Sequence, residues 1–282
     1  MPAGDNTDKP TVAGFGREWS TFTQGTDALH DADRQAIFDG YFAIFPWQRL
    51  PPEATGADIG CGSGRWATLV APRVGHLHAV DAAEDALAVA RQNLAGRPNV
   101  TFHHASVAKL PFAPRSLDFA YSLGVLHHVP DTAQAIRDVA RALKPGAPFL
   151  IYLYYAFDNR SAAFRALWRL SNLGRIVLSR APYAVQIAAT TLIAMLVYWP
   201  LARVAALLDV VGALPRSWPL AFYRRRSFYV MRTDAFDRFC TRLEQRFTRN
   251  EIAAMLRDAG FTSVTFSENE PYWVAVGIAG QA

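Results

Sequence analysis

The feature that most constrains the fold of this chain is a glycine-rich turn between a short apolar strand and a helix. Residues 57–59 read as the end of a strand, residues 60–64 (GCGSG) form the turn, and a helix is expected from about Arg65. Glycines let the backbone turn sharply and approach a ligand closely. The pattern favours a cofactor cradle at the carboxyl end of a strand, although a simple tight turn has the same composition.

The spacing of the glycines and the next acidic residue narrow the cofactor class. A dinucleotide fingerprint requires G-x-G-x-x-G, whereas Arg65 occupies the sixth position here and the spacing is G-x-G-x-G. This favours a nucleoside-plus-amino-acid cofactor over one with a pyrophosphate. Asp81 ends the next expected strand, where its carboxylate can accept two hydrogen bonds from ribose hydroxyls. The alternative role for Asp81 is a helix cap or an ordinary turn residue.

Short strands and helices alternate through the middle of the chain. Strands are expected near residues 57–59, 76–81, 100–105, 117–123 and 148–155, and helices over 84–94 and 132–143. This rhythm predicts a mostly parallel, doubly wound α/β sheet. Residues 156–246 then read mainly as helices. The α/β pattern resumes with a capping box at Thr248 and Glu251, a helix to Gly260, and two final strands in FTSVTF and YWVAVGI.

Four ordered segments together resemble one known family. They are ADIGCGSGRWA, HAVDAAEDALAVAR, LDFAYSLGVLHHVPD and RALKPGAPFLI. Residues 55–155 resemble the class I S-adenosylmethionine-dependent methyltransferases, of the type 11-like group that includes quinone-biosynthesis C-methyltransferases. The resemblance implies a Rossmann-like doubly wound sheet of seven strands, the last antiparallel, with a helical insertion between strands five and six. The expected parts are a disordered tail and helical cap (1–50, disordered to 14), a cofactor-binding core (51–155), an acceptor insertion (156–246) and a closing helix and strand pair (247–282).

The resemblance also assigns cofactor contacts to particular residues. It implies that the turn holds the methionine part, that the end of strand two holds the ribose, and that the ends of strands three and four reach the adenine and the amino group. Many family members have an aspartate where this chain has Ser106. A lid is expected from FGREWSTF, with Phe15, although ordinary helix packing explains this segment equally well. The implied contacts are Asp58, Gly60, Cys61, Gly62, Gly64, Asp81, Ala82, Ser106, Val107, Ser122, Leu123, Arg17 and Trp19.

Methyl transfer from a sulfonium needs mainly proximity and orientation, and a general base only when the acceptor must lose a proton. His127 and His128 follow strand four on the ligand side of the sheet and are the candidate bases; packing of the loop is the alternative role. No cluster of Cys, Asp or Glu has metal-ligand spacing, so no metal site is predicted.

The basic charge of the chain is concentrated in the insertion. Residues 156–246 contain 14 arginines, no lysine and five acids, a net charge of +9, while the whole chain has +5. Such a segment suits an anionic substrate or membrane surface, or simply a solvated surface. The uncharged stretch 181–202 is long enough to span a bilayer, but both flanking strands must join one sheet. A buried lid helix is the first expectation, and peripheral membrane contact through 181–208 is the second. Candidate acceptor residues are Tyr154, Tyr155, Asp158, Tyr223, Arg224 and Arg226.

The sequence therefore predicts transfer of a methyl group from S-adenosylmethionine to a small or lipid-linked acceptor. A cofactor-binding partner protein without catalysis and an NAD-dependent oxidoreductase are the alternatives. No nucleic-acid-binding module is recognisable. With only two cysteines and no apolar signal core at the N-terminus, a cytoplasmic protein is expected, with membrane association through the insertion as an option.

Overall fold

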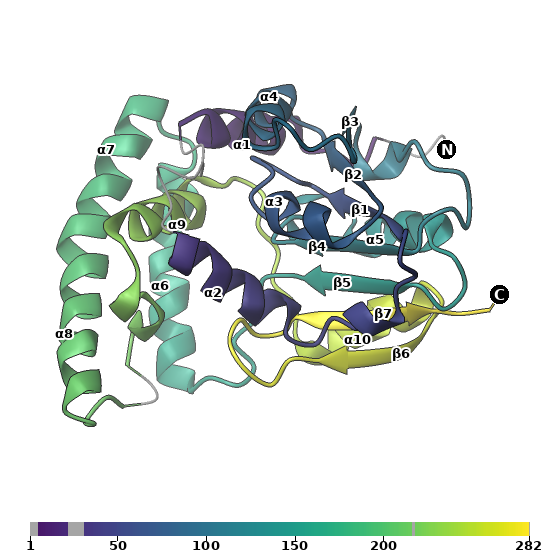
Figure 1. Cartoon of the computed structure of the whole chain (residues 1–282). Coiled ribbons are helices and arrows are strands. Elements are labelled where there is room, and N and C mark those ends of the chain that lie inside the picture. Colours follow the sequence, from purple (N-terminus) through teal and green to yellow (C-terminus); the bar gives the residue numbers. More distant parts are fainter. Residues whose placement is uncertain (1–4, 22–30, 216–217, 282) are drawn as a thin grey trace. The chain divides into compact units, whose positions relative to one another are not determined.

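The computed structural model describes residues 5–21, 31–215 and 218–281. Within these residues the chain forms two compact units. The sheet unit contains residues 5–21, 35–160 and 243–281, and the helical unit contains residues 31–34 and 161–242. The two units are described separately below, and Figure 1 labels their elements. The insertion expected from the sequence spanned 156–246.

The sheet unit is built on a seven-stranded sheet in the order β3-β2-β1-β4-β5-β7-β6. Strands β1 to β5 pair in parallel, and β7 pairs antiparallel with both β5 and β6. The predicted seven-stranded, doubly wound sheet with an antiparallel last strand is therefore confirmed. The strands are β1 (Thr55–Ile59), β2 (His76–Asp81), β3 (Val100–His104), β4 (Phe119–Leu123), β5 (Pro148–Tyr152), β6 (Phe261–Phe266) and β7 (Ala275–Ala279).

Helices cover both faces of this sheet. One face carries α5 and α10, and the other carries α2, α3 and α4. The capping box of α10 forms as predicted, because the Thr248 side chain accepts from Glu251 N while Glu251 accepts from Thr248 N. The helices around the sheet are α1 (Lys9–Thr21), α2 (Asp31–Phe42), α3 (Ala67–Val70), α4 (Glu84–Asn93), α5 (Thr132–Ala142) and α10 (Arg249–Asp258), with short 3-10 turns at Trp47–Arg49, Ala71–Arg73, Val107–Lys109 and Leu126–His128.

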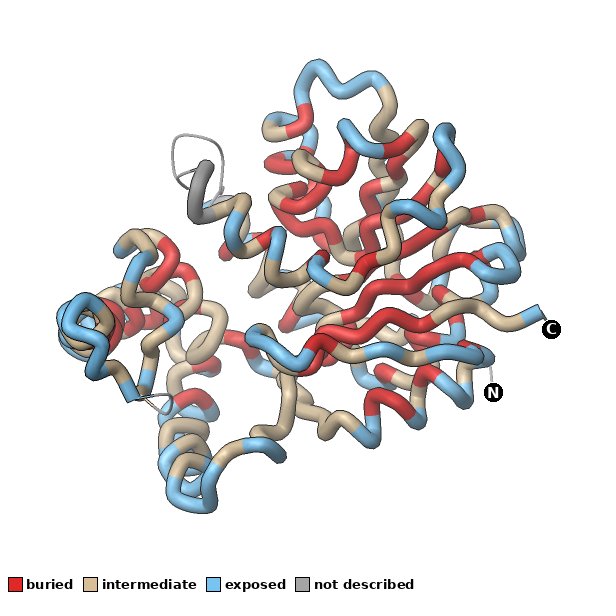
Figure 2. The backbone as a smooth tube through the Cα atoms, turned by 60° about the horizontal axis from the view of Figure 1, so that its bottom comes forward, coloured by how far each residue is buried: buried red, intermediate tan, exposed pale blue. Residues whose placement is uncertain are grey.

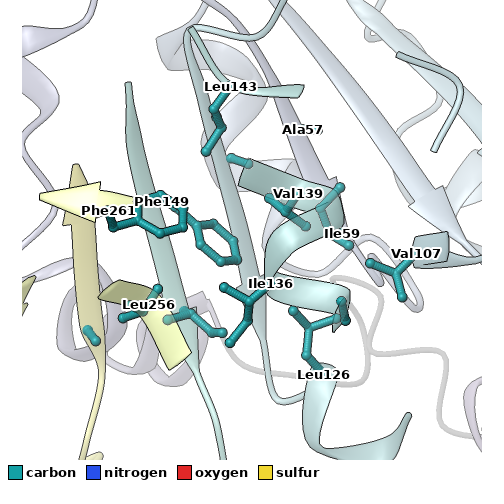
Figure 3. Packing of buried hydrophobic residues seen from close by; sticks show 14 of the residues in the cluster. Ala57, Ile59, Val107, Leu126, Ile136, Val139, Leu143, Phe149, Leu256 and Phe261 are labelled. Atoms are coloured by element: carbon teal, nitrogen blue, oxygen red, sulfur yellow. The ribbon is translucent and has the colours of Figure 1, made fainter. Parts of the chain in front are cut away.

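Successive side chains along each strand point to opposite faces of the sheet, so each face has its own part of the hydrophobic core. On β5, Phe149 and Ile151 face α5 and α10, while Leu150 faces the opposite layer. Figure 3 shows Phe149, Phe261 and, from α5, Ile136 in the cluster of buried side chains on the face that carries α5 and α10. The central strands are almost entirely buried, as the red tube in Figure 2 shows. Two-sided burial fixes the strand register, and with it the positions of the strand ends that carry the functional residues.

The N-terminal segment corrects one expectation from the sequence. Residues 9–14 were expected to be disordered with the rest of the tail, but α1 begins at Lys9. Asp8 caps this helix, since its Oδ2 accepts from Thr11 N at 3.0 Å. Asn6 also holds the segment, because its side chain donates to Asp131 O and accepts from Asp131 N, both at 2.8 Å. These long-range hydrogen bonds order a segment whose polar composition alone suggested disorder.

The chain leaves and re-enters the sheet unit through a paired stem. Tyr155 and Phe247 form a parallel bridge, with Phe247 N donating to Tyr154 O and Ala156 N donating to Phe247 O, both at 2.9 Å. The segments before and after the insertion are therefore held side by side by backbone hydrogen bonds.

The helical unit contains one helix of 28 residues that runs from Tyr183 to Val210. It comprises α7 (Tyr183–Ile193), a π-helical turn (Ala194–Tyr198) and α8 (Trp199–Val210). The π turn ends two residues before Pro200, which lacks an N–H and cannot continue a regular hydrogen-bond ladder. The other helices are α6 (Ala162–Leu178), a 3-10 helix (Ala221–Arg225) and α9 (Phe228–Cys240).

The burial of this long helix differs from the first expectation. In length and composition it qualifies as a membrane-spanning helix, but only 22% of its most apolar window is buried. The expected buried lid helix is therefore wrong for this segment. Most of its large apolar side chains are exposed, while its buried positions are alanines, Tyr198 and the polar residues Gln186 and Thr190.

Candidate functional site

The candidate site lies at the carboxyl ends of β1, β2 and β4. The strand order reverses between β1 and β4, because β2 and β3 lie on one side of β1 and β5 lies beyond β4. In open α/β sheets, ligands bind in the crevice at such a switch point. The glycine turn follows β1 here, Asp81 ends β2, and the loop with His127 and His128 follows β4.

The glycine turn is anchored to the neighbouring strand. Gly60 N and Cys61 N both donate to Val80 O, at 2.8 and 2.9 Å. Gly60 adopts a φ of 79° and Gly62 a φ of 53°, a region that disfavours residues with a Cβ. A Cβ on Gly60 would also lie 2.3 Å from Val125 Cγ1, so the loop after β4 packs directly against the turn.

Asp81 is oriented toward this turn by two backbone donors. Gly62 N donates to Asp81 Oδ2 and Ala83 N donates to Oδ1, each at 2.8 Å. Each carboxylate oxygen can accept further hydrogen bonds, so the group can still receive two ribose hydroxyls. Burial raises the pKa of Asp81, and the two N–H donors oppose that rise. Asp81 and the turn thus fit a ribose-containing cofactor that approaches the backbone at Gly62.

Asp58 lies behind the turn in a fully enclosed position. Tyr121 Oη donates to its Oδ2 at 2.9 Å, and Ser122 Oγ donates to Ile59 O at 2.8 Å. Burial raises the pKa of Asp58 to about 8; the Tyr121 hydrogen bond opposes the rise, and the nearby Asp81 adds to it. A cationic group on a ligand would favour the ionised carboxylate, which suits the amino-acid part of the expected cofactor.

Helix α1 covers part of the site. A Cβ on Gly62 would lie 3.0 Å from Trp19 Nε1, so the indole packs on the turn itself. The Phe15 ring lies 4.9 Å from the His128 ring, centroid to centroid. Thr11 Oγ1 accepts from Leu243 N at 3.2 Å, which joins the helix to the chain that returns from the insertion. Arg17 is exposed on the same helix.

The remaining predicted cofactor residues surround Asp81 and the turn. Ala105 N donates to Asp81 O at 3.0 Å, which places Ser106 beside the end of β2. Ser106 Oγ donates to Asp5 Oδ1 at 3.1 Å, and Ala82 O lies 3.0 Å from His104 Nε2. Cys61, Val107 and Ser122 are buried, whereas Ala82, Ser106 and Leu123 are partly buried. The structure thus places Trp19 against the turn, Ala82 and Ser106 at the end of β2, and Ser122 beside the end of β1, while the cofactor roles of these residues and of Arg17 stay predictions.

The two histidines after β4 are buried, and their Nδ1 atoms have opposite hydrogen-bonding roles. His127 Nδ1 accepts from Tyr154 N at 3.4 Å, which places the proton of the neutral ring on Nε2. His128 Nδ1 lies 2.6 Å from Leu243 O and donates to it, so in the neutral ring the lone pair is on Nε2. Burial is the main reason that the pKa of His127 lies well below its usual value, so this ring is neutral at pH 7.

The returning chain supplies two charged residues that the sequence did not single out. Glu244 and Arg246 form an ion pair of 2.9 Å, with side-chain exposures of 1% and 13%. The Arg246 guanidinium lies 5.0 Å from the centre of the Tyr154 ring, which stacks on His127 at 3.9 Å. Because 91 positions separate Arg246 from Tyr155, to whose carbonyl it also donates, only the three-dimensional fold reveals the cluster.

The other predicted acceptor residues of the sheet unit have partners within it. Asp158 accepts hydrogen bonds with both carboxylate oxygens: Oδ1 accepts from Trp273 Nε1 at 2.8 Å, and Oδ2 accepts from Arg249 N at 3.1 Å. Tyr155 Oη accepts from Arg160 Nε at 3.2 Å. Asp158 therefore has a clear structural role, which the sequence did not anticipate.

Tyr223, Arg224 and Arg226 belong to the helical unit. Tyr223 Oη donates to Asp234 Oδ2 at 2.8 Å, Arg224 lies 3.1 Å from Asp209, and the Arg226 guanidinium lies 5.3 Å from the Phe222 ring centre. Their assignment to the acceptor stays a prediction. In the part of the chain that the structure describes, no three His, Cys, Asp or Glu side chains are grouped to hold a metal ion.

Comparison with known proteins agrees with the geometry of the sheet unit. Residues 57–151 match the family model described as a methyltransferase domain. A demethylmenaquinone methyltransferase of Listeria welshimeri is 34% identical over 94 residues, which cover 32% of this chain and 40% of that protein. Phosphoethanolamine N-methyltransferase 2 of Caenorhabditis elegans is 33% identical over 106 residues, covering 36% of this chain and 24% of the relative.

The matched region is a fraction of each relative. The chain spans about two fifths or less of the length of these curated relatives. A solved S-adenosylmethionine-dependent methyltransferase from Thermotoga maritima superposes over 95% of this chain and 99% of its own, with a TM-score of 0.53 and 14% identity, which shows a common fold. The glycine turn, Asp81, the seven-stranded sheet and the family match together identify the sheet unit as a class I S-adenosylmethionine-dependent methyltransferase domain.

Proposed function

We propose that this chain transfers a methyl group from S-adenosylmethionine to a small-molecule or lipid-linked acceptor. The observation that carries the proposal is the contact between Asp81 and the glycine turn, where Gly62 N and Ala83 N hold the carboxylate at 2.8 Å each. A carboxylate fixed in this way is set to accept hydrogen bonds from a ribose, and the turn beside it has no side chain at Gly62. The arrangement supports donor binding in the crevice.

The residues of this chain mainly bind and orient the donor. When bound, S-adenosylmethionine supplies an electrophilic methyl group on a sulfonium, so the protein has little covalent chemistry to perform. Asp81 would hold the ribose hydroxyls, and Asp58 would favour a cationic amino group. Trp19 would exclude water at Gly62. Orientation of this kind lowers the barrier by removing translational and rotational freedom before the reaction.

The histidine tautomers support different roles for His127 and His128 in the acceptor site. His127 carries its proton on Nε2 and is suited to donate a hydrogen bond, while His128 has its lone pair on Nε2 and is suited to accept a proton. We therefore assign the general base, where the acceptor needs one, to His128. His127 would orient the acceptor instead.

We expect the insertion to bind the acceptor and to determine which molecule is methylated. The relatives named demethylmenaquinone methyltransferase and phosphoethanolamine N-methyltransferase each match about a third of this chain but differ in acceptor by name. The family model that both names share as methyltransferases matches residues 57–151, which supports donor binding by this segment rather than acceptor choice. Acceptor choice would then depend on residues outside 57–151, such as Arg246 and the helical unit.

Two measurements test the proposal. Calorimetry with S-adenosylmethionine and with NAD should give heat of binding for the methyl donor alone. A radiolabelled donor incubated with lipid and aqueous fractions of a cell extract should then label an acceptor. Binding of the donor without labelling in any fraction would favour the non-catalytic partner protein, and binding of NAD would favour the oxidoreductase.

A further inference from the structure

The helical unit has an inverted distribution of apolar and polar side chains. In the described residues, every large apolar side chain that is at least 36% exposed lies between 167 and 228, within this unit. On α6 the outward side chains are Leu167, Leu170, Leu173 and Val177, exposed by 60–74%. A helix in water normally turns its leucines inward, so this pattern indicates an apolar medium outside α6.

The inward face of α6 is polar, so this helix buries polar side chains and exposes apolar ones. Arg175 is buried and donates to Thr241 O at 2.8 Å and to Arg242 O at 3.2 Å, at the end of α9. Arg238 of α9 donates to Ser171 Oγ at 3.2 Å, and its guanidinium lies 5.2 Å from the Trp168 ring centre. Because these partners fix which side of α6 meets α9, the leucine side faces away from the rest of the unit.

The 28-residue helix repeats this arrangement. Its buried positions recur about every four residues and include Gln186, Thr190, Ala194 and Tyr198. The opposite side carries large apolar side chains with exposures of 42–87%, namely Val185, Leu192, Met195, Leu196, Val197, Trp199, Val204, Leu207 and Val210. We call these side chains, together with the exposed leucines and Val177 of α6, the outward apolar face.

Positive charge is concentrated in the same unit. Residues 161–242 contain 12 arginines, no lysine and three aspartates, a net charge of +9. Arg165 and Arg169 are exposed on α6 and Arg180 is exposed just after it, and the Arg225 side chain is 78% exposed. A second copy of the chain would bring an equal positive charge against this one, whereas an anionic surface would be attracted to it.

We propose that the outward apolar face binds the surface of an anionic phospholipid bilayer. The apolar side chains enter the boundary between headgroups and acyl chains, and the exposed arginines contact lipid phosphates. The helix lies along the surface rather than across the membrane. The paired stem at Tyr155 and Phe247 returns the chain to the same side, and Arg203 and Asp209 lie within the helix. This proposal goes beyond methyl transfer and does not depend on it.

Flotation of the donor-free full-length chain with vesicles tests the proposal without any turnover. The chain should float with vesicles containing phosphatidylglycerol, should float less with pure phosphatidylcholine, and should be released by an alkaline carbonate wash. Leu170→Glu with Leu196→Glu should abolish flotation, while Ala88→Glu with Ala95→Glu, at exposed positions of the sheet unit, should leave it unchanged. Arg165→Gln should weaken binding to the anionic vesicles about fivefold, the fold-change equivalent to ~1 kcal/mol per arginine.

Three outcomes would overturn the proposal. Absence of flotation with anionic vesicles would exclude a lipid surface as the partner. Resistance to the carbonate wash would indicate a spanning helix. Dimerisation of the wild-type chain that is lost in the double glutamate variant, together with no vesicle binding, would show that a second copy covers the face. Calorimetry with S-adenosylmethionine on the same preparations separates these outcomes from failure of the methyltransferase assignment.

Discussion

Tyr121 on β4 donates a hydrogen bond of 2.9 Å to the carboxylate of Asp58 on β1, inside the sheet and directly behind the glycine turn. The two strands are neighbours at the point where the strand order reverses. The contact therefore connects the protonation of a buried acid with the place where the donor binds.

The stability of the donor-free protein should depend on pH through Asp58. The pKa of this group is about 8 in the folded protein and 3.8 as the reference for the unfolded chain. A raised pKa stabilises the folded state fully below pH 3.8, and the contribution is lost as pH rises through about 8. Asp58→Asn should therefore flatten the dependence of unfolding free energy on pH across this window, as measured by urea denaturation.

Tyr121→Phe provides the matched control for that measurement. The phenol hydrogen bond lowers the pKa of Asp58, so its removal should move the upper end of the window to higher pH. A wild-type curve that already lacks pH dependence between the two values would contradict the burial of a protonated Asp58.

Asp81→Asn should weaken binding of S-adenosylmethionine roughly hundredfold. The substitution keeps the size of the side chain but removes the charge from two hydrogen bonds to the ribose, each worth ~1.5–3 kcal/mol when one partner is charged. Titration calorimetry gives the dissociation constant. Glu84→Gln, an exposed carboxylate at the start of α4, is the control and should bind as the wild type does. Equal affinities for the two variants would refute the ribose assignment.

Gly62→Ala should lower the free energy of unfolding by about 1–2 kcal/mol from backbone strain alone, because its φ is 53°. The added methyl would also displace the indole of Trp19, whose Nε1 lies 3.0 Å from that position. Part of the loss should therefore be recovered in Gly62→Ala with Trp19→Ala, compared with the sum of the two single variants. Strict additivity in this double-mutant cycle would mean that α1 does not pack on the turn.

Replacement of the histidines should separate their roles once a labelled acceptor is available. His128→Asn retains a donor toward Leu243 O but removes the lone pair of Nε2, and should reduce turnover about hundredfold or more if the acceptor must lose a proton. The affinity of this variant for S-adenosylmethionine should not change. His127→Asn should act mainly on the Michaelis constant of the acceptor. If His128→Asn changes only the Michaelis constant, and if the turnover of neither variant depends on pH, then another group is the base or the reaction uses none.

Local patterns in the sequence predicted the parts of the fold that depend on neighbouring residues. The alternation of strands and helices from 55 to 155, the glycine turn and the capping box at Thr248 all follow from short-range preferences, and the structure contains each of them. Asp81 was likewise identified by its place at the end of β2.

Features that depend on distant partners were missed. The order of residues 5–14 depends on Asn6 contacting Asp131, and the cluster around Tyr154 depends on Glu244 and Arg246 of the returning chain. The exposure of the long helix likewise contradicted the first expectation of a buried lid helix. An apolar helix in a core and one that faces an apolar surrounding have the same composition, and only the positions of its polar contacts distinguish them.

The stem at Tyr155 and Phe247 has a consequence for how such a protein changes over time. Since the sheet unit holds both ends of the insertion together, the length and sequence between them can vary without altering the sheet or the donor crevice. Under the function and the lipid contact proposed above, exchange of that stretch for another would change the acceptor or the bound surface and leave the strands that hold the methyl donor as they are.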